Sequence, residues 1–586
     1  MKNRIKQYLL AASMCVGLTA CSDFFEPIPG VQFGLDETFA SKQRTEEYLN
    51  NVYSYVREVT DAIHPNTYGG IFTEASLDGA NRWNKTYAEW TNGSFNSASA
   101  QASEYFSKYY QAIAKASTFI QNVDKCTEAA ASTRGKWKSE ARALRAYYYF
   151  ELLRLYGPIP LIGEDPIPLD ASLEELIKER NSVDECVNFI ATELQSAIDS
   201  GDLLQRAGKA NLGRMDVATC MALKAKLYLY WASPLFNGNT DQASVKNKDG
   251  KQLFPQTEDH SKWTQARDAY ERFMTFATGQ GYKLTEVYTN GKLDPYASCR
   301  AAGEFFTTTW EAVDELIFVK LRDLYDYTYW VCPKFTDFQD TDVTGGGGYY
   351  TTQETVDLFF TKDGLTIEED PGYDKFEGIP GANNFTSGRY YDPNNPSRLY
   401  FDADKSKVLK QWKDREPRFY VNITYSGSIW LNEGKYNEEM RTDFTNGANG
   451  TCGKSKASGD CPDSGYLIRR GAKASNNNGS KHFSPVLRLA DMYLGYAEAL
   501  CMCSDLDNAL TYLNKIRVRA GIPEYTFTAT AGKVTCPKTQ TDLLNRIRRE
   551  RLVELVFEWN RYFDVRRWKV AEGQNDPEHW IYPAYH

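Results

Sequence analysis

The sequence predicts a mostly α-helical protein, in which a scaffold of paired helices is interrupted by one large loop-rich insert. Apolar residues recur three and four positions apart over many segments, as they do on the buried face of a helix. The segments follow one another as antiparallel pairs that are similar to tetratricopeptide units with long inserts. From residue 284 to 480 the pattern changes to short apolar runs between turn-rich stretches.

The composition excludes several classes of protein. The chain has 586 residues, of which 42% are hydrophobic and 25% charged, so it is neither a polytopic membrane protein nor a disordered chain. The formal net charge is −9, so the chain lacks the excess of Lys and Arg that a nucleic-acid-binding protein needs. Aromatic residues make up 14% of the chain, enough for a core and for flat apolar platforms on the surface.

The N-terminus has the features of an export signal. Basic residues precede an apolar stretch, Tyr8–Leu18, which is shorter than the ~20 residues that span a bilayer. Leu18-Thr19-Ala20-Cys21 looks like a bacterial lipobox. We therefore expect residues 1–20 to be a signal peptide, Cys21 to be lipidated, and residues 21–40 to be a tether. The alternative is an ordinary cleaved signal that ends near a cysteine.

The N-terminal helical part is predicted over residues 41–283. Within it, residues 136–156 carry a continuous apolar stripe that includes Tyr148, and Gly157-Pro158 ends the helix because proline lacks the donor for another turn. Ser182 is the expected N-cap of the helix that follows it. The helices are expected at residues 41–59, 103–123, 136–156, 183–199, 216–232 and 263–277.

The insert, residues 284–480, is expected to be irregular and to carry binding loops. The runs Glu315–Val319 and Phe419–Ile423 are typical of strands or extended segments. Gly345–Gly348 suggests a phosphate cradle, but no Lys-Ser/Thr follows it, so a flexible loop is the preferred interpretation.

Residues 481–586 again show helical periodicity, with helices expected at residues 485–503, 505–520 and 540–559. The last of these carries the charged run Arg546–Arg551, followed by Glu554 and Glu558. We interpret this run as a structural lock, because arginines can reach the carbonyls and carboxylates of neighbouring helices with forked geometry. An active site is the less favoured alternative.

No motif predicts catalysis or a cofactor. The chain has neither a Gly-x-Ser-x-Gly elbow nor a His-Glu-x-x-His pair, and no residue stands out as a catalytic group. Asp337, Asp340 and Asp342 lack the glycine and the terminal glutamate of an EF-hand, so we expect a solvated acidic loop, with a Ca²⁺ site as the alternative. Cys452 and Cys461 bracket a Gly/Ser/Lys loop and are the best local candidates for a disulfide in an exported chain.

Seven motifs stand out in order along the chain: Cys21-Ser-Asp-Phe-Phe-Glu, Glu140–Leu161, Phe360–Leu365, Arg415–Phe419, Pro485–Ala499, Leu513–Gly521 and Arg549–Trp568. Together they resemble the SusD/RagB family of Bacteroidetes surface nutrient-binding lipoproteins. The resemblance covers almost the whole chain, with one departure at Trp559, where the family commonly has glycine.

The resemblance implies a right-handed superhelix of tetratricopeptide-like pairs and a non-enzymatic role. That role is to capture a nutrient, usually an oligosaccharide or polysaccharide, and to deliver it to a SusC-like TonB-dependent transporter. It also implies a lipid anchor in the outer membrane through acylated Cys21, with the protein facing the cell exterior. Two alternatives stay open: peptide cargo, as in the RagB branch, and a surface glycoside hydrolase with two convergent carboxylates.

A saccharide offers apolar C–H faces and a rim of hydroxyls, so its site needs flat aromatic platforms with polar groups beside them. Two segments have this inventory, and the family places ligand loops at comparable positions. The first segment contributes Asp78, Asn81, Arg82, Trp83, Tyr87, Trp90 and Asn92. The second contributes Tyr325, Tyr327, Tyr329 and Trp330. The alternative for each tryptophan is packing within its loop.

Overall fold

The structure is a computed structural model of the chain. The residues that it describes are 34–56, 63–64, 67–68, 71–76, 78–82, 96, 99–163, 171–303, 313–322, 325–335, 345–375, 380–430, 440–445, 452–453, 459–472 and 482–570.

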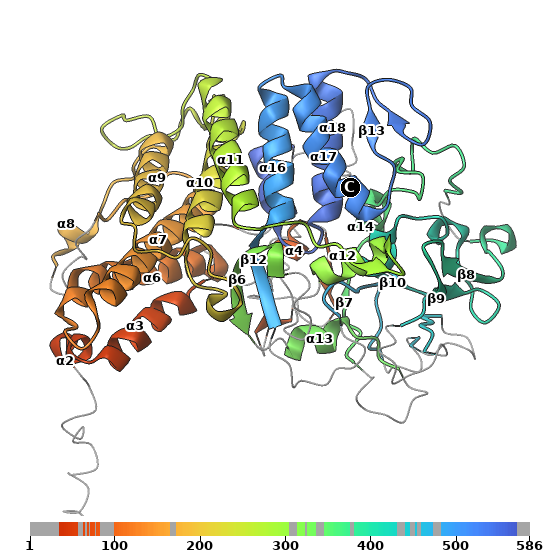
Figure 1. Cartoon of the computed structure of the whole chain (residues 1–586), viewed down its shortest axis with the longest axis horizontal. Coiled ribbons are helices and arrows are strands. Elements are labelled where there is room, and N and C mark those ends of the chain that lie inside the picture. The colour runs from red at the N-terminus through yellow and green to blue at the C-terminus, as the bar shows by residue number, and fades with distance from the viewer. Residues whose placement is uncertain are drawn as a thin grey trace, which may run out of the picture.

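Long helices form the scaffold, and successive members pack against one another from α6 through α11 and on to α16–α18 (Figure 1). The predicted fold class, a mostly α chain of tetratricopeptide-like pairs, is confirmed. The scaffold helices are α2 (Leu35–Ala40), α3 (Lys42–Ser54), α6 (Ala100–Asn122), α7 (Ala131–Tyr156), α9 (Val183–Asp199), α10 (Val217–Ala232), α11 (Ser261–Gly279), α16 (Leu489–Met502), α17 (Leu506–Ala520), α18 (Gln540–Glu554) and α19 (Asn560–Arg567).

Shorter elements connect and cover the scaffold. The short helices are α4 (Ile71–Glu74), α8 (Leu173–Leu176), α12 (Pro295–Gly303), α13 (Tyr325–Val331), α14 (Gln353–Leu358) and α15 (Pro417–Asn422). The strands are β1 (Ile63–His64), β2 (Thr67–Tyr68), β3 (Ala80–Asn81), β4 (Tyr288–Thr289), β5 (Lys292–Leu293), β6 (Leu316–Arg322), β7 (Tyr349–Tyr350), β8 (Arg389–Asp392), β9 (Asn395–Asp402), β10 (Ile423–Tyr425), β11 (Tyr466–Ile468), β12 (His482–Arg488), β13 (Tyr525–Thr526) and β14 (Val534–Thr535).

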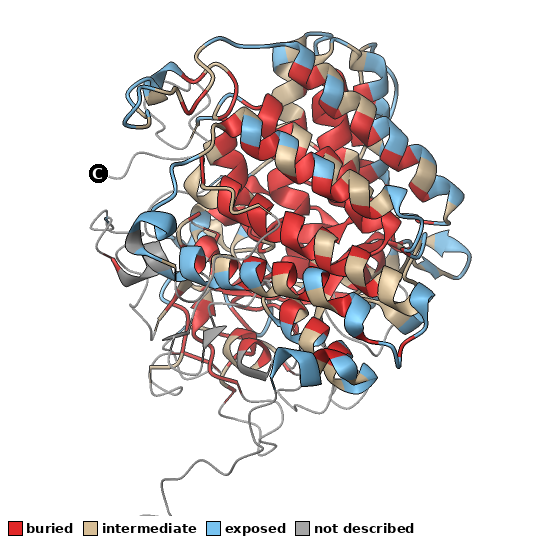
Figure 2. Cartoon of the chain, turned by 90° about the vertical axis from the view of Figure 1, so that its left-hand side faces the viewer, coloured by how far each residue is buried: buried red, intermediate tan, exposed pale blue. Residues whose placement is uncertain are grey.

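Helices such as α9 and α11 bury one face and leave the other to solvent, whereas α7, α10 and α16 are buried on almost all sides. Figure 2 shows helices with alternating red and blue faces beside helices that are almost entirely red. Tyr148 of α7 is fully buried, and its hydroxyl donates to the carbonyl of Val52 at 2.5 Å. Ser182 caps α9 as predicted, because its hydroxyl accepts from the backbone of Glu185. Gly157 ends α7 with φ 71, a conformation that glycine adopts without strain.

Two sequence expectations about local structure are wrong. The segment Phe419–Asn422 lies in helix α15, and the strand begins only at Ile423. Pro417 at the first turn pre-organises that helix, and a short apolar run cannot be told from a strand by periodicity alone. The helix expected to continue to residue 559 ends at Glu554. Trp559 instead precedes α19 with φ 64, which accounts for the glycine common at this position.

The charged run of α18 is a buried lock, as predicted. Glu554 lies among Arg418, Arg488 and Arg519, and Arg488 Nη1 is 2.8 Å from Glu554 Oε1. Arg549 donates from Nε to the carbonyl of Leu358 at 2.8 Å. These contacts fasten α18 to elements of the insert and to α17, so the lock joins the insert to the C-terminal helices.

Candidate functional site

A four-stranded sheet at the centre of the insert brings distant segments together. Its strand order is β10-β11-β7-β3, with every neighbouring pair antiparallel. Ile423, Ile468 and Tyr349 belong to the buried core beneath the sheet. Tyr350 pairs with both Leu467 and Ala80, and it is only partly buried. Because side chains alternate along a strand, Tyr350 leaves the sheet on the face opposite that core.

The glycine run predicted as a flexible loop instead joins the two segments chosen from the sequence. Gly348 accepts a hydrogen bond from the backbone of Arg82 at 3.0 Å and donates to the carbonyl of Trp330 at 3.1 Å. Gly346 donates to the carbonyl of Tyr329 at 2.7 Å. Residues 78–82 and 325–335 are therefore held side by side by the strand that follows the glycines.

The aromatic part of the site is set by close packing against glycine. Tyr329 and Trp330 are partly buried, and their rings meet edge to face with centroids 5.2 Å apart. A methyl group at Gly346 would lie 2.5 Å from Cε3 of Trp330. Only a residue without a side chain fits against this ring, so the glycine fixes where the indole lies.

The polar part of the site is centred on Arg82. Its guanidinium forms an ion pair with Asp463, and Nη1 also donates to the carbonyl of Cys461 at 3.1 Å. Asp463 is 53% exposed, so this pair faces solvent. Sequence reasoning missed Asp463 and Tyr350, because only the strand pairing brings residues so far apart in the chain to Arg82.

Three of the predicted ligand residues are buried in the fold: Asp78, Asn81 of β3, and Tyr327. Asp78 is fully buried and pairs with Arg561, with Nη1 and Oδ1 3.1 Å apart. Burial raises the pKa of Asp78, and Arg561 opposes that rise. Tyr327 is 4% exposed, and its hydroxyl donates to the carbonyl of Arg470 at 2.6 Å. None of the three side chains is available as an exposed platform.

Of the other predicted ligand residues, some belong to described elements and the rest lie outside the described residues. Tyr325 begins α13. Trp83, Tyr87, Trp90 and Asn92 lie outside the described residues, as do Asp337, Asp340, Asp342 and Cys21.

The predicted disulfide is not found among the described residues. Cys452 and Cys461 are both buried, and each segment is fixed by other contacts. The backbone of Cys452 donates to the carbonyl of Asp443 at 2.9 Å, whereas Cys461 is held by Arg82. The short separation of the two cysteines in the sequence suggested the bond, but it could not predict that Cys452 contacts Asp443 and Cys461 contacts Arg82.

A buried carboxyl supports the strand that carries Arg82. Glu74 of α4 is 6% exposed, and its Oε1 atom has no hydrogen-bond partner. Burial raises the pKa of Glu74 to about 8, and a hydrogen bond with the backbone of Asn81 opposes the rise. The group is therefore neutral at neutral pH.

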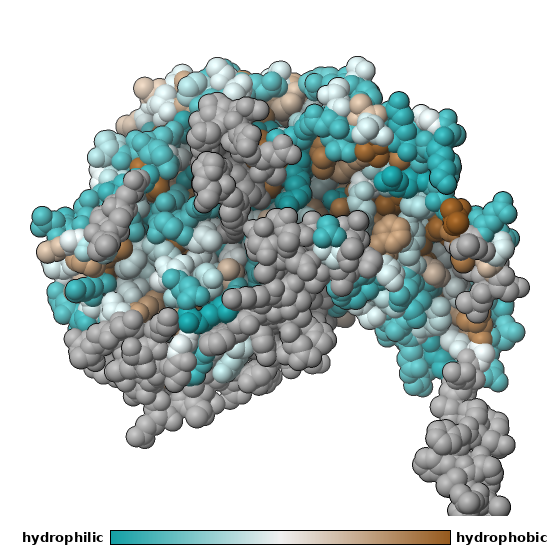
Figure 3. Space-filling model, turned by 180° about the vertical axis from the view of Figure 1, so that it is seen from behind, coloured by the Kyte–Doolittle hydropathy of each residue, from teal (hydrophilic) through white to brown (hydrophobic). Residues whose placement is uncertain are grey.

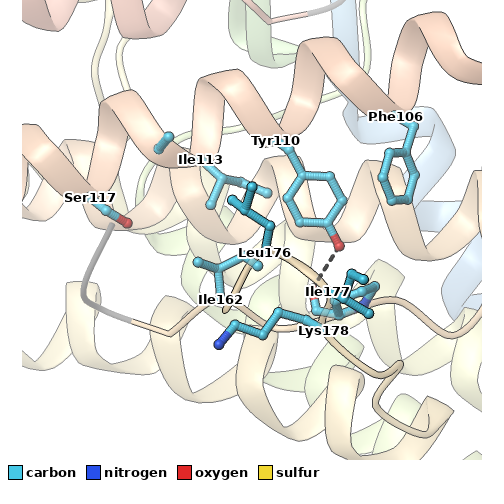
Figure 4. Close-up of a pocket in the computed structure, with 10 residues that line it drawn as sticks. Phe106, Tyr110, Ile113, Ser117, Ile162, Leu176, Ile177 and Lys178 are labelled. Carbon is cyan, nitrogen blue, oxygen red and sulfur yellow. Dashed lines mark hydrogen bonds between the residues drawn. The ribbon is translucent and has the colours of Figure 1, made fainter. Parts of the chain in front are cut away.

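A separate crevice of about 430 Å³ lies between α6 and the chain around α8. Figure 4 shows Tyr110 of α6 facing Ile162 and Leu176, with its hydroxyl donating to the carbonyl of Pro160 at 2.7 Å. Lys178 is the charged residue of the lining. Figure 3 shows brown apolar atoms on the side of the molecule that carries these helices. The walls offer few polar groups, so the crevice suits an apolar group better than a saccharide.

The described residues hold no cluster of His, Cys, Asp or Glu suited to a metal ion. No helix within them is both long and apolar enough to cross a bilayer.

The scaffold and the sheet-bearing insert define a class: helical-pair proteins interrupted by one irregular insert. A sequence profile described as "SusD family" matches residues 315–579, and one described as "Starch-binding associating with outer membrane" matches residues 32–229. The chain belongs to the SusD/RagB family. A curated SusD-like protein of Bacteroides ovatus is 27% identical over 175 residues, which are 29% of this chain and 30% of that relative.

Solved structures share the fold over most of the chain. The structure named BT4246 has a TM-score of 0.70 and 25% identity, and the match covers 91% of this chain and 90% of that one. A SusD-like protein from Bacteroides fragilis has a TM-score of 0.65 and 22% identity, with 92% and 90% covered. Surface glycan-binding protein A from Bacteroides uniformis has a TM-score of 0.54 and 16% identity, with 93% and 94% covered.

Proposed function

We propose that the protein is a cell-surface lipoprotein that binds a nutrient oligosaccharide or polysaccharide and delivers it to a SusC-like TonB-dependent transporter. The observation that carries the proposal is the junction at Gly348, which holds Arg82 beside Trp330. A partly buried aromatic pair with an exposed ion pair nearby offers both of the surfaces that a saccharide needs. Family membership supports a carbohydrate ligand, as the name of the matching profile suggests.

In this proposal Trp330 and Tyr329 stack on the apolar face of a sugar, and Arg82, Asp463 and Tyr350 contact its hydroxyls. Trp83, Tyr87, Trp90 and Asn92 follow Arg82 in the sequence and are proposed to extend the same surface. A chain of sugars that crosses several such contacts gains affinity by summing modest terms, and can still be released to a transporter. The protein binds its ligand without hydrolysing it.

A glycan array followed by calorimetry tests the proposal. Saccharides that bind the wild type should bind Trp330→Ala more weakly. Tyr288→Ala is the matched control, because Tyr288 is 60% exposed and lies in the β4–β5 hairpin, outside the proposed site. Absence of binding to any saccharide, or equal loss in the control, contradicts the proposal.

The lipid anchor is tested separately. Acyl chains on Cys21 are proposed to be the attachment to the outer membrane, since each buried CH₂ contributes about 0.8 kcal/mol. Cys21→Ala should fold normally and leave the membrane fraction. If the variant stays with membranes in cells that lack the transporter, the anchor is elsewhere.

A further inference from the structure

Among the residues that the structure describes, one buried arginine has a guanidinium with neither a hydrogen bond nor an acidic partner. Arg469 is 7% exposed and follows β11, where its backbone donates to the carbonyl of Asn422 at 2.8 Å. Its Nε is buried without a hydrogen-bond partner. Among the described side chains, no hydrogen bond or ion pair of this guanidinium is recorded, and its ring contact is Trp430 at 5.7 Å.

The other buried arginines in the described part of the chain all differ from Arg469 in this respect. Arg415 and Arg549 donate to backbone carbonyls. The rest pair with carboxylates: Arg145 with Glu193, Arg418 with Glu416, Arg470 and Arg488 with Glu558, Arg517 with Glu550, Arg519 with Glu554, Arg551 with Asp491, Arg561 with Asp78, and Arg567 with Glu498. A buried cation without such compensation is costly, and each of these other arginines has at least one carboxylate or carbonyl partner.

The surroundings of Arg469 are aromatic and positively charged. Its charge opposes the burial that raises the pKa of Tyr425, whose buried hydroxyl also lacks a hydrogen-bond partner. Burial lowers the pKa of Arg469 itself; Tyr296 opposes this shift, and the charge of nearby Arg300 adds to it. The environment therefore disfavours the cation as it stands and would favour an anion beside it.

This cluster lies on the buried side of α13, the helix that carries Tyr329 and Trp330. Trp430, which Arg469 approaches, meets the ring of Phe335 at 6.4 Å, just beyond α13. The carbonyl of Arg470 accepts the hydroxyl of Tyr327 in α13 itself. The buried side of this helix thus contacts the chain at the residue after Arg469.

We propose that Arg469 binds an anionic group of the ligand, so that the protein recognises an acidic glycan bearing carboxylates or sulfates. This inference rests on the proposed function. Guanidinium groups bind carboxylate and sulfate oxygens through short, charge-assisted hydrogen bonds, and the flanking rings suit the apolar face of the same sugar.

The test uses the full-length protein with two pairs of probes. One pair is an oligogalacturonate and its methyl-esterified neutral form, and the other is a sulfated oligosaccharide and its desulfated form. At least one acidic probe should bind the wild type roughly tenfold or more tighter than its neutral counterpart. Arg469→Met should bind the members of each pair equally, and Arg469→Lys should restore part of the preference.

Melting curves supply the second readout. Without ligand, Arg469→Met should melt at or above the wild-type temperature, because it removes an uncompensated buried charge. Arg415→Met is the control: it strands carbonyls that accept from Arg415 at 2.7 and 2.8 Å, so it should melt lower.

The outcomes separate the two proposals. Equal binding of acidic and neutral probes by the wild type rejects an anion site at Arg469 while leaving the glycan-binding function standing. A charge preference that persists in Arg469→Met also rejects it, as does a large fall in the melting temperature of that variant. Failure of every saccharide to bind the wild type rejects both.

Discussion

The lock beneath α18 and the sheet around Gly348 connect distant parts of the chain in opposite ways. In the lock, long charged side chains meet in the interior, and Glu554 contacts Arg418, Arg488 and Arg519. In the sheet, backbone hydrogen bonds through a side-chain-free residue join Arg82 to Trp330. In the lock the charged groups pair with one another in the interior, whereas the sheet leaves an aromatic pair and an ion pair partly open to solvent. We therefore expect the lock to contribute mainly to stability and the sheet to recognition.

The largest expected effect is on the lock. Burial raises the pKa of Glu554, but Arg519, Arg488 and Arg418 outweigh it and hold the pKa well below its usual range. Glu554→Gln leaves these guanidiniums without their shared charge, so we expect a loss of about 3–5 kcal/mol in the free energy of unfolding. Denaturant titration measures it.

The control for that variant is Glu104→Gln, since Glu104 pairs with Lys108 on the exposed face of α6. Such pairs are worth about 0–1 kcal/mol. Similar losses in the two variants would mean that the lock is not a principal source of stability.

The stability of the protein should depend on pH through Glu74, which lies beside the sheet. Its folded pKa of about 8 exceeds the unfolded value, so the unfolded state releases its proton first as pH rises. Stability should fall by about 1.4 kcal/mol for each pH unit between the two pKa values and level off above the folded one. Glu74→Gln should remove this dependence, and the two proteins should diverge from pH 5 towards pH 8 in melting experiments. Parallel pH profiles would show that Glu74 does not titrate in this way.

Gly346 tests the packing that places the aromatic pair. An alanine there puts a carbon 2.5 Å from the Trp330 ring, and overpacking of this kind costs about 1–3 kcal/mol. We expect Gly346→Ala to weaken saccharide binding as well, because the indole must move. Gly279→Ala is the control, since no atom lies within 4 Å of the added carbon. Unchanged binding by Gly346→Ala would mean that the position of the indole does not matter.

The sequence predicted the scaffold better than the site. The ends of α9 and α17 agree closely with the pattern, because periodicity, caps and glycine stops all act locally. The unusual backbone conformation of Trp559 could be predicted only by comparison with the family, because a positive φ leaves no mark on the periodicity of apolar residues. Arg82 and Trp330 were singled out for their chemistry, but nothing local predicted that Gly348 would join them.

The tertiary partners of individual residues could not be predicted from the local sequence either. Asp78 and Tyr327 have the chemistry of ligand contacts, yet their partners Arg561 and Arg470 lie far along the chain and draw them into the interior. The isolation of Arg469 is likewise a tertiary property, because it is defined by the absence of a carboxylate that any of many residues could have supplied.

The most direct test of the account is a paired titration and melting curve for Trp330→Ala, with Tyr288→Ala as the control. Stacking on a sugar contributes roughly 0.5–1.5 kcal/mol beyond area burial, so affinity should fall about threefold to tenfold. The melting temperature should fall less than it does when a fully buried aromatic is removed, because the ring is only partly buried. A variant that melts much lower but binds as tightly as the wild type would make Trp330 a packing residue and would contradict the assignment of recognition to the sheet.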